Sequence, residues 1–384
     1  MLLPTLTSLT VLLKAFLLSA LLTSFLVPQI IKLALKLHLT DKPGYRKIHK
    51  YETPTLGGIG IFAAFSMSYL TTINSYDPDT RFFFAALLML FFIGITDDLI
   101  NIRPVKKLLL EILAAMIIIV LADIRFTTFH GFLGLHIIPL WLSVSVTLFI
   151  MIVIINALNL IDGVDGLAAS ISILAAIVLG FWFWNRGSTG NAIITASLAG
   201  TQAVFLVFNM SKGKYKIFMG DSGSLVIGLI LSILIIRFNE LNAAPETVRP
   251  LHSAPAVSIA ILIVPLFDTL RVFIIRILYH QSPFKADDRH IHHLMLRAGY
   301  SPRESTLYIS IAHILIIAVA FLLDNIGIFM LSIVLLLICM GLTGLVHLKV
   351  RNNNRRQRLP EDKIEIGKVT NLKHIAHHNE KKSI

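Results

Sequence analysis

Long apolar segments separated by short polar stretches run along most of the chain, from Leu9 to Leu348. A bilayer with about 30 Å of hydrocarbon requires roughly 20 apolar residues for each crossing helix. Applied to these segments, that length predicts about eleven membrane-spanning helices and therefore an all-α polytopic membrane protein. The predicted helices cover residues 9–31, 57–73, 81–96, 106–122, 137–156, 166–184, 190–208, 224–238, 255–277, 305–323 and 327–347.

The chain shows no repeat at a fixed period and no low-complexity tract, so residues 1–348 are predicted to form one transmembrane domain. Residues 349–384 are polar and rich in Lys and Arg, which is typical of a disordered cytoplasmic tail or of a segment lying on anionic lipid headgroups. The apolar N-terminal segment has neither a basic leader nor an Ala-x-Ala cleavage site. We therefore interpret it as the first membrane helix.

Composition agrees with a membrane protein. The chain is 55% hydrophobic and only 15% charged, whereas a soluble domain is about half apolar and about one quarter charged. The single cysteine, Cys339, lies in an apolar run. A disulfide framework, a haem attachment motif and a cysteine zinc site are thereby excluded within this chain.

Lys and Arg are concentrated in alternate loops, and cytoplasmic loops of membrane proteins are richer in these residues. The basic loops and the tail are therefore predicted to face the cytoplasm, with the N-terminus outside. The net charge of +12 then requires no nucleic acid partner. The basic set comprises Lys32, Lys36, Lys42, Arg46, Lys47, Lys50, Arg103, Lys106, Lys107, Lys212, Lys214, Lys216, Arg276, Lys285, Arg289, Arg297 and Arg303.

The unusual polar motifs all fall in this basic set of loops. The first is DKPGYRKIHKYETPTLGG, where Arg46, Lys47 and His49 precede a Gly57-Gly58 helix start. Glycines at a helix start allow backbone N–H groups to approach a phosphate. Positive-inside topology alone also explains the basic residues.

The second motif is GITDDLINIRPVKKL, in which Asp97 and Asp98 end a predicted helix at the membrane surface. Neighbouring carboxylates repel each other, which favours a bound cation or a raised pKa in one of them. Because carboxylates are disfavoured at a helix C-terminus, a purely structural role is less well supported than a functional one.

The third motif, NALNLIDGVDGLA, places Asn156, Asn159, Asp162 and Asp165 between two apolar helices. Continued helical spacing aligns the last three of these on one face. Such oxygen ligands suit Mg²⁺ or hydrogen bonding to a nucleobase and ribose. A simple turn at the Asp-Gly pairs is the alternative.

Two further motifs complete the set. KGKYKIFMGDSGSLVIG brings a basic stretch to Asp221 at a glycine-rich helix start, where this residue serves as a metal ligand or as a helix cap. The loop SPFKADDRHIHHLMLRAGYSPRES carries Arg289, His290, His292 and His293, for which phosphate binding is a better prediction than zinc. Asp268 and Arg271, at i and i+3 within an apolar helix, are expected to pair or to face a ligand.

In this order, the Asp pair, NxxNLIDGxDGLA, MGDSGS, PLFDTLRV and SPFKADDRHIHH resemble the polyprenyl-phosphate N-acetylhexosamine-1-phosphate transferase family, over about residues 40–300. The chain is most similar to the undecaprenyl-phosphate GlcNAc-1-phosphate transferases that start O-antigen, common-antigen and teichoic-acid linkage synthesis. Phospho-MurNAc-pentapeptide transferases of peptidoglycan synthesis usually carry three histidines followed by an acidic residue, whereas Leu294 follows His293 here. The peptidoglycan enzyme is therefore the lesser alternative.

The resemblance implies a Mg²⁺-dependent reaction, with Mn²⁺ as a substitute ion, in which polyprenyl phosphate attacks the sugar-bearing phosphate of a UDP-sugar and UMP leaves. It implies a multi-pass inner-membrane enzyme with its active site on the cytoplasmic face. The expected partners are the UDP-sugar, the polyprenyl (undecaprenyl) phosphate and membrane lipids, and a homodimer stays open. GlcNAc is favoured, while GalNAc, QuiNAc and FucNAc derivatives stay open as the sugar.

The resemblance also implies roles for individual residues. Asn159 and Asp221 are expected to hold the metal, and Asp97 is expected to act as base or to organise the lipid phosphate, supported by Asp98. Asp162 and Asp165 are expected to place the nucleotide or organise the site. The expected substrate-binding residues are Arg46, Lys47, His49, Asn156, Asp268, Arg289, His290, His292 and His293.

A proton-coupled transporter is the alternative from another class, because intramembrane charges such as Asp268 and Arg271 commonly mark ion routes. Transporters place their substrate sites near the bilayer midplane, often between internal repeats. Here the acidic and histidine motifs are predicted at one membrane surface, and no repeat is evident. The transferase is therefore the favoured prediction.

Overall fold

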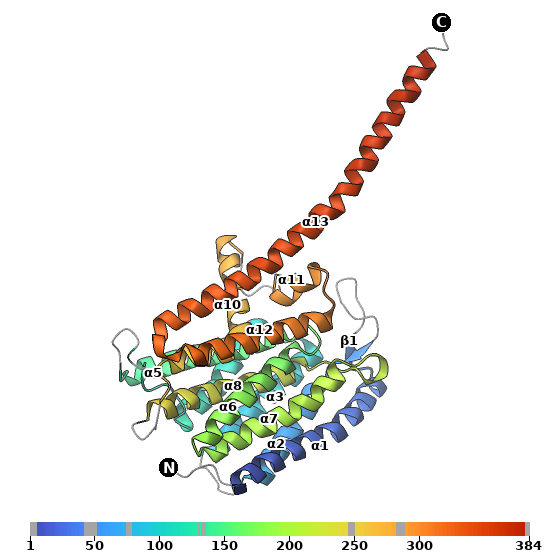
Figure 1. The fold of residues 1–384 in the computed structure, drawn as a ribbon. Helices are drawn as coiled ribbons and strands as arrows, with labels where there is room; N and C mark the ends of the chain where they lie inside the picture. The colour runs from blue at the N-terminus through green and yellow to red at the C-terminus, as the bar shows by residue number, and fades with distance from the viewer. Residues whose placement is uncertain are drawn as a thin grey trace.

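The computed structural model describes residues 6–41, 52–73, 79–129, 131, 136–244, 250–281 and 289–380. For residues 6–7, 41 and 355–380 it describes the backbone only. The helices lie side by side in one bundle, and two short strands flank one end (Figure 1). The strands β1 (Thr40–Asp41) and β2 (Thr53–Pro54) pair antiparallel, with Thr40 opposite Pro54.

The helices follow the predicted apolar segments closely. They are α1 (Leu6–Lys36), α2 (Gly57–Thr72), α3 (Thr80–Ile100), α4 (Pro104–Met116) with the π-helical turn η1 (Ile117–Leu121), α5 (Leu140–Ile161), α6 (Leu167–Asn185), α7 (Thr189–Asn209), η3 (Gly213–Tyr215), α8 (Gly220–Ala243), α9 (Ala254–Ile261), α10 (Ile263–Leu278), α11 (Ile291–Arg297), α12 (Pro302–Leu322), η4 (Asp324–Ile326) and α13 (Ile328–Glu380).

The predicted class, an all-α polytopic membrane protein, is confirmed. Within the described ranges, eight helices are long and apolar enough to cross a membrane, and the bent pair α9 and α10 makes up to nine. All eleven predicted segments are helical, but the count of eleven spans is not confirmed. The count is lower because α2, with 16 residues, and α4, with 13, are too short to be counted as membrane spans.

The segment predicted as one helix over residues 255–277 is instead two helices, α9 and α10, that meet at 84°. Pro265, in the first turn of α10, has no N–H and its ring clashes with the carbonyl four residues earlier, which is that of Ile261. That carbonyl instead makes a 3.0 Å hydrogen bond with Nε2 of His313, a fully buried residue of α12. The prediction of one continuous helix was wrong because it took no account of this proline.

The interior of the bundle is formed around α8, and 83% of the residues in its most apolar stretch are buried. Helices that are apolar on all sides are expected in such positions. Small residues allow neighbouring backbones to come close to it. A Cβ added at Gly94 of α3 would lie 2.3 Å from Cα of Ser222, and one at Gly228 would lie 2.7 Å from Cα of Ile155 in α5.

The loops predicted to face outward gather at one end of the bundle. Both carboxylate oxygens of Glu240 accept hydrogen bonds from Thr127, one from its backbone N–H and one from its hydroxyl. Asp324 accepts hydrogen bonds from the backbone N–H groups of His252 and Ser253, at 2.9 and 2.8 Å. The motif-bearing loops contact one another at the opposite end, as described below. The described contacts of the two sets of loops therefore lie at different ends of the bundle, while the predicted topology stays a prediction.

Helix α13 continues to Glu380 and projects well beyond the bundle (Figure 1). Its backbone is helical as far as Glu380, and the disorder predicted for residues 349–384 stays a prediction. Lys, Arg and Glu have favourable helix propensities, and these three residue types are frequent in this segment. The division into a transmembrane domain and a separate tail stays a prediction.

Candidate functional site

A polar cleft of about 640 Å³ opens at the end of the bundle where the basic loops meet. We call it the aspartate cleft, because four aspartates from three different segments line it. Its lining comprises His38, Leu39, Thr40, Thr55, Asp97, Asp98, Leu99, Asn101, Asn159, Leu160, Asp162, Gly163, Gly220 and Asp221. Five of the residues predicted for catalysis or metal binding are thus brought together.

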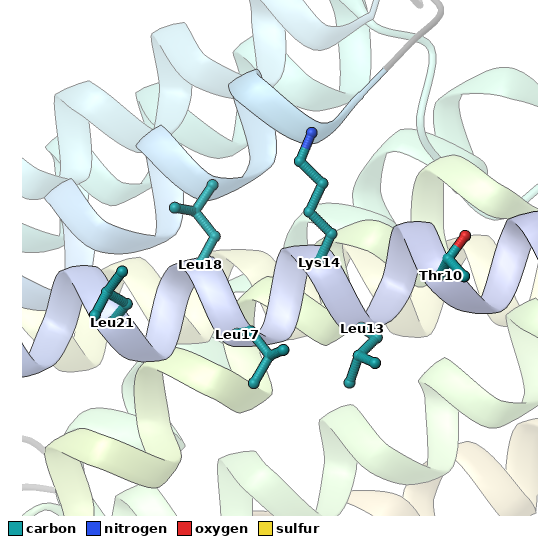
Figure 2. Close-up of a pocket in the computed structure, with 6 residues that line it drawn as sticks. All are labelled: Thr10, Leu13, Lys14, Leu17, Leu18 and Leu21. Carbon is teal, nitrogen blue, oxygen red and sulfur yellow. The ribbon is translucent and has the colours of Figure 1, made fainter.

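A second hollow, of about 450 Å³, lies on α1 and has a different character (Figure 2). Figure 2 shows four leucine side chains along one helix with Lys14 as the one charge among the labelled residues. Long lysine side chains in membrane helices commonly extend toward the headgroups. This apolar surface offers no set of acids and bases, so the chemistry belongs to the aspartate cleft.

Asp98 joins the end of α3 to the start of α8. Its carboxylate accepts hydrogen bonds from the backbone N–H groups of Asp221 at 2.7 Å and Ser222 at 3.1 Å, and from the Ser222 hydroxyl at 2.7 Å. Gly220 adopts φ 72°, and a Cβ there would lie 2.7 Å from a carboxylate oxygen of Asp98. The N–H groups at this helix start, which favour an anion, are therefore occupied by a carboxylate of the protein itself.

Lys107 connects the two carboxylates that face each other across the aspartate cleft. Its Nζ donates to Asp97 and to Asp221, each at 2.9 Å, and Asp97 also accepts from the backbone N–H of Ile102 at 2.6 Å. The sequence analysis treated Lys107 only as a marker of topology. The sequence did contain a signal for this contact. Asn101 ends α3 at φ 51° and Pro104 begins α4, and this tight turn brings α4, with Lys107, back toward the end of α3.

Asn159 lies near the end of α5 and contacts the same carboxylate. Its side-chain amide donates to Asp221 and, at 2.9 Å, to the Ser224 hydroxyl. The two residues predicted to hold a metal ion are thus neighbours in the aspartate cleft, although they are 62 positions apart in the sequence.

The prediction that Asn159, Asp162 and Asp165 share one helical face was wrong. Helix α5 ends at Ile161, and a turn containing Gly166 at φ 80° leads into α6. Asp162 lines the aspartate cleft. Asp165 instead forms an ion pair with Nζ of Lys216, and its carbonyl accepts a hydrogen bond from Thr306 at 2.8 Å.

The start of α2 also differs from the prediction. The backbone N–H of Gly57 donates to the carbonyl of Phe218 at 3.0 Å, and that of Gly58 donates to Met219 at 2.8 Å. These groups fix α2 against the segment that leads into α8, so the prediction that they approach a phosphate was wrong. The basic residues Arg46, Lys47 and His49, predicted to act with them, lie outside the described residues.

The histidine motif, residues 289–293, lies beside the aspartate cleft rather than in its lining. His292 is 2% exposed, and a Cβ added at Gly163 of the cleft wall would lie 2.8 Å from its Nε2. Its ring is 4.4 Å from that of His293 and stacks at 5.7 Å on that of His290. Burial lowers the pKa of His292 to about 3, so this side chain is neutral near pH 7.

Asp268 of α10 organises the histidine motif. Its carboxylate, 1% exposed, pairs with Arg271 at 2.7 Å, with Nδ1 of His290 at 2.9 Å and with the backbone N–H of Ile291 at 2.8 Å. The predicted pairing of Asp268 with Arg271 is therefore confirmed. Arg289 stacks its guanidinium on Tyr279, 5.5 Å from the ring centroid. Whether these residues bind substrate stays a prediction.

The aspartate cleft fits a divalent cation. Burial, and then the nearby carboxylates of Asp221, Asp98 and Asp165, raise the pKa of Asp162 well above its usual range, and a bound cation relieves such repulsion. Over the described ranges, no three His, Cys, Asp or Glu side chains form a ready-made metal site. Mg²⁺ commonly uses one or two carboxylates together with substrate phosphates, so Asp221 with Asn159 suits this ion better than zinc.

Comparisons with known proteins agree with this geometry. The chain is 30% identical over 284 residues to the undecaprenyl-phosphate alpha-N-acetylglucosaminyl 1-phosphate transferase of Yersinia pestis, covering 73% of this chain and 76% of that protein. The corresponding Escherichia coli K12 enzyme is 28% identical, covering 76% and 78%. A probable undecaprenyl-phosphate N-acetylglucosaminyl 1-phosphate transferase of Bacillus subtilis is 29% identical, covering 88% and 93%. The model of glycosyl transferase family 4 matches residues 80–239. The chain therefore belongs to glycosyl transferase family 4, as the resemblance of its motifs predicted.

Proposed function

We propose that this protein transfers GlcNAc-1-phosphate from UDP-GlcNAc to undecaprenyl phosphate, as the first membrane step in the synthesis of a cell-surface polysaccharide. The names of its relatives support this reaction. The single observation that carries the proposal is the convergence of Asp97, Asn159 and Asp221, from three helices, on one cleft at the end of a membrane-embedded bundle.

The reaction exchanges one phosphoanhydride bond for another and leaves the bond between the sugar and its phosphate intact. An oxygen of the lipid phosphate forms a bond to the sugar-bearing phosphorus of UDP-GlcNAc, and the bond between that phosphorus and the oxygen bridging to UMP breaks. The products are undecaprenyl-pyrophosphate-GlcNAc and UMP, and water does not take part. Such a transfer depends mainly on positioning and on charge stabilisation, which polar side chains around a cleft supply.

Asn159 and Asp221 are the proposed ligands of a magnesium ion. Bound Mg²⁺ supplies Lewis acidity toward the pyrophosphate oxygens. Asp98 has a distinct part, because it accepts hydrogen bonds from the backbone N–H groups of Asp221 and Ser222 and from the Ser222 hydroxyl. Its proposed contribution is to hold the start of α8 in place, and thereby the Asp221 carboxylate.

Asp97 and Lys107 are proposed to act on the acceptor phosphate. Asp97 lies at the end of a membrane-spanning helix, where the phosphate of a lipid embedded in the bilayer is within reach. Its carboxylate accepts a proton from a protonated lipid phosphate, or orients a phosphate that is already ionised. Lys107, which pairs with Asp97 at 2.9 Å, places a positive charge beside the same group.

The remaining predicted residues are proposed to hold the nucleotide sugar. His292 is neutral near pH 7, so it contributes hydrogen bonds rather than charge. Among the described residues, Arg271 and Arg289 are cations next to the histidine motif. The proposed set comprises Asp162, Asp165, Asn156, Asp268, Arg289, His290, His292, His293, Arg46, Lys47 and His49.

The proposed location is the bacterial inner membrane, with the aspartate cleft toward the cytoplasm. The basic residues of the loops at this end support that orientation. A soluble nucleotide sugar then reaches the cleft from the cytoplasm, and the isoprenoid chain enters from the side, between helices.

The decisive experiment is an assay of UMP release by the purified protein with undecaprenyl phosphate, MgCl₂ and a panel of UDP-N-acetylhexosamines. We expect release with UDP-GlcNAc, loss of release with a chelator, and recovery with added Mg²⁺. Asp221→Asn should abolish release and should also abolish the Mg²⁺-induced rise in Tm, while the protein still accumulates in membranes. No release with any UDP-sugar would reject the proposed reaction, and near-native turnover by Asp221→Asn would remove this residue from the metal site.

A further inference from the structure

Glu111 is a buried carboxylate that the proposed chemistry leaves unused. It lies in α4, one helical turn after Lys107, and is 0% exposed. One of its oxygens accepts a hydrogen bond from the Asn156 amide at 2.6 Å, and the other has no hydrogen-bond partner among the described residues. A buried polar atom without a partner costs free energy of folding. Such a residue is more costly than an apolar side chain of similar size, which points to a role beyond packing.

The partner residue, Asn156, is held in one orientation. Its Nδ2 donates to Glu111 at 2.6 Å and to the carbonyl of Ile152 at 3.0 Å. The Ile152 carbonyl can only accept, and the Glu111 oxygen accepts here, so the amide nitrogen faces these two groups and the amide oxygen faces away. Rotating the amide by half a turn would place three oxygens together.

The amide oxygen of Asn156 is consequently the free group of this pair. No hydrogen bond to it is formed within the described part of the chain, and the residue is only partly buried. Asn156 precedes Asn159 and Leu160 by three and four positions on α5, and both of those residues line the aspartate cleft. Residues at these spacings share one helix face, so the free oxygen lies one turn below the cleft wall.

We propose that Glu111 is a positioning residue, which fixes the Asn156 amide so that its oxygen is presented to a hydrogen-bond donor of the bound UDP-sugar. This inference rests on the proposed function, because it takes the nucleotide sugar as the ligand. In its ionised form a carboxylate suits the task, because it has no donor and disfavours the rotated amide. The unpartnered second oxygen is the cost of that selectivity.

The proposal predicts how KM changes when the acid of Glu111 and the amide of Asn156 are swapped between the two positions. Asn156→Asp places a second carboxylate against Glu111 and leaves both without a donor. Glu111→Gln in the same chain restores the pair, because the Gln amide donates to one Asp oxygen and leaves the other free. We expect Asn156→Asp to raise KM for UDP-GlcNAc about tenfold or more, since one lost hydrogen bond of ~1.4 kcal/mol corresponds to tenfold. The double variant should recover part of this loss and give a KM clearly below that of Asn156→Asp, although one Asp oxygen still faces the Ile152 carbonyl.

Glu111→Leu provides the test of Glu111 alone. It removes the acceptor and the unpartnered oxygen together, so we expect KM to rise about tenfold with little change in kcat and no loss of Tm. Glu111→Gln should raise KM less than Glu111→Leu does, because its amide oxygen still accepts from Asn156 while its amide nitrogen also allows the rotated orientation. Asp324→Asn is the matched control, since Asp324 is also buried, at 7% exposed, but lies at the opposite end of the bundle. It should lower Tm and leave KM unchanged.

Two results would overturn the proposal. One is an unchanged KM in Glu111→Leu, and the other is a double variant no better than Asn156→Asp. If Glu111→Leu does not fold, the exchange between Glu111→Gln and Asn156→Asp still decides the matter. The wild-type protein separates this question from the proposed function. If the wild-type protein releases no UMP, the proposed reaction is rejected. The role of Glu111 is then rejected too, because it takes the UDP-sugar as the ligand. Recovery of Tm in the double variant would in that case show only that residues 111 and 156 form a structural pair.

Discussion

The carboxylate of Asp98 accepts a 2.7 Å hydrogen bond from the backbone N–H of Asp221, a residue 123 positions later in the chain. One aspartate therefore acts as the cap for the helix that carries the other. Adjacent acidic residues at a membrane surface suggest two equivalent ligands. Here Asp97 instead pairs with Lys107, while Asp98 accepts a hydrogen bond from the backbone N–H of Ser222. This division of labour leads to the first prediction.

Asp98→Asn should lower both stability and turnover. Asn retains one acceptor oxygen but loses the charge that is favourable at a helix N-terminus, which corresponds to ~1 kcal/mol of the free energy of unfolding. The measurements are Tm in detergent and kcat for UMP release. Asp123→Asn is the control, because that carboxylate is 77% exposed and pairs only with nearby Arg125. A wild-type Tm in Asp98→Asn would show that the cap contributes nothing.

Lys107→Met should make the protein depend more strongly on added Mg²⁺. Without the ammonium group, the carboxylates of Asp97 and Asp221 face each other unscreened, so Tm without metal should fall. The rise in Tm on adding MgCl₂ should then exceed that of the wild type. Lys106→Met is the matched control, since Lys106 is the exposed neighbour on the same helix. A Mg²⁺ response equal to the wild type in both variants would contradict this prediction.

The buried His292 should make stability depend on pH in a defined direction. Its pKa is about 3 in the folded protein, against 6.5 as the ordinary value, so the unfolded chain binds the proton more readily. The stabilisation is complete above about pH 6.5 and is lost progressively as pH falls toward 3. In His292→Asn, the decline in Tm between pH 7 and 5 should be flatter than in the wild type.

His280→Asn serves as the reference for this pH series. His280 is exposed and adopts φ 52°, a backbone conformation that Asn also tolerates. Its decline in Tm should match the wild type. Equal slopes in His292→Asn and in the wild type would mean that His292 does not stay neutral in the folded state.

Orientation in the membrane can be tested by thiol labelling of intact cells. Lys212→Cys lies at the end that carries the aspartate cleft, and Thr189→Cys lies at the opposite end; both positions are exposed. A membrane-impermeant maleimide should label Thr189→Cys and should leave Lys212→Cys unlabelled until the cells are lysed. The native Cys339 is buried and gives a low background. The reverse labelling pattern would place the cleft outside and reject the proposed access of cytoplasmic substrate.

The sequence was sufficient to predict the helices but not the way in which they combine. Apolar length is a local property, so each predicted segment is helical in the structure. The contact between Asp98 and Asp221 depends on how α3 packs against α8, which local patterns do not encode. The bend at Pro265 and the turn at Gly166 were available as local signals, and including them would have corrected both wrong helix assignments.

The candidate site was predicted in part for the same reason. Residue types and motif order indicated the aspartates and Asn159, which the fold brings to one cleft. Lys107 and Glu111 were missed because Lys is expected in any cytoplasmic loop and a single Glu in an apolar helix has no motif around it. Their importance comes from their partners, Asp221 and Asn156, on other helices.

The sharp bend between α9 and α10 has a consequence for the surrounding lipid. An α-helix rises about 1.5 Å per residue, so the eight residues of α9 extend about 12 Å, far less than the hydrocarbon thickness of about 30 Å. Helix α10 then continues at 84° to α9 and packs against α5. It leaves Phe273, Ile274 and Ile277 exposed. Because a bilayer responds to a short apolar segment by thinning locally, we expect thinning around this bent pair. Bilayer thickness is then expected to influence the position of the histidine motif, which Asp268 of α10 holds through His290.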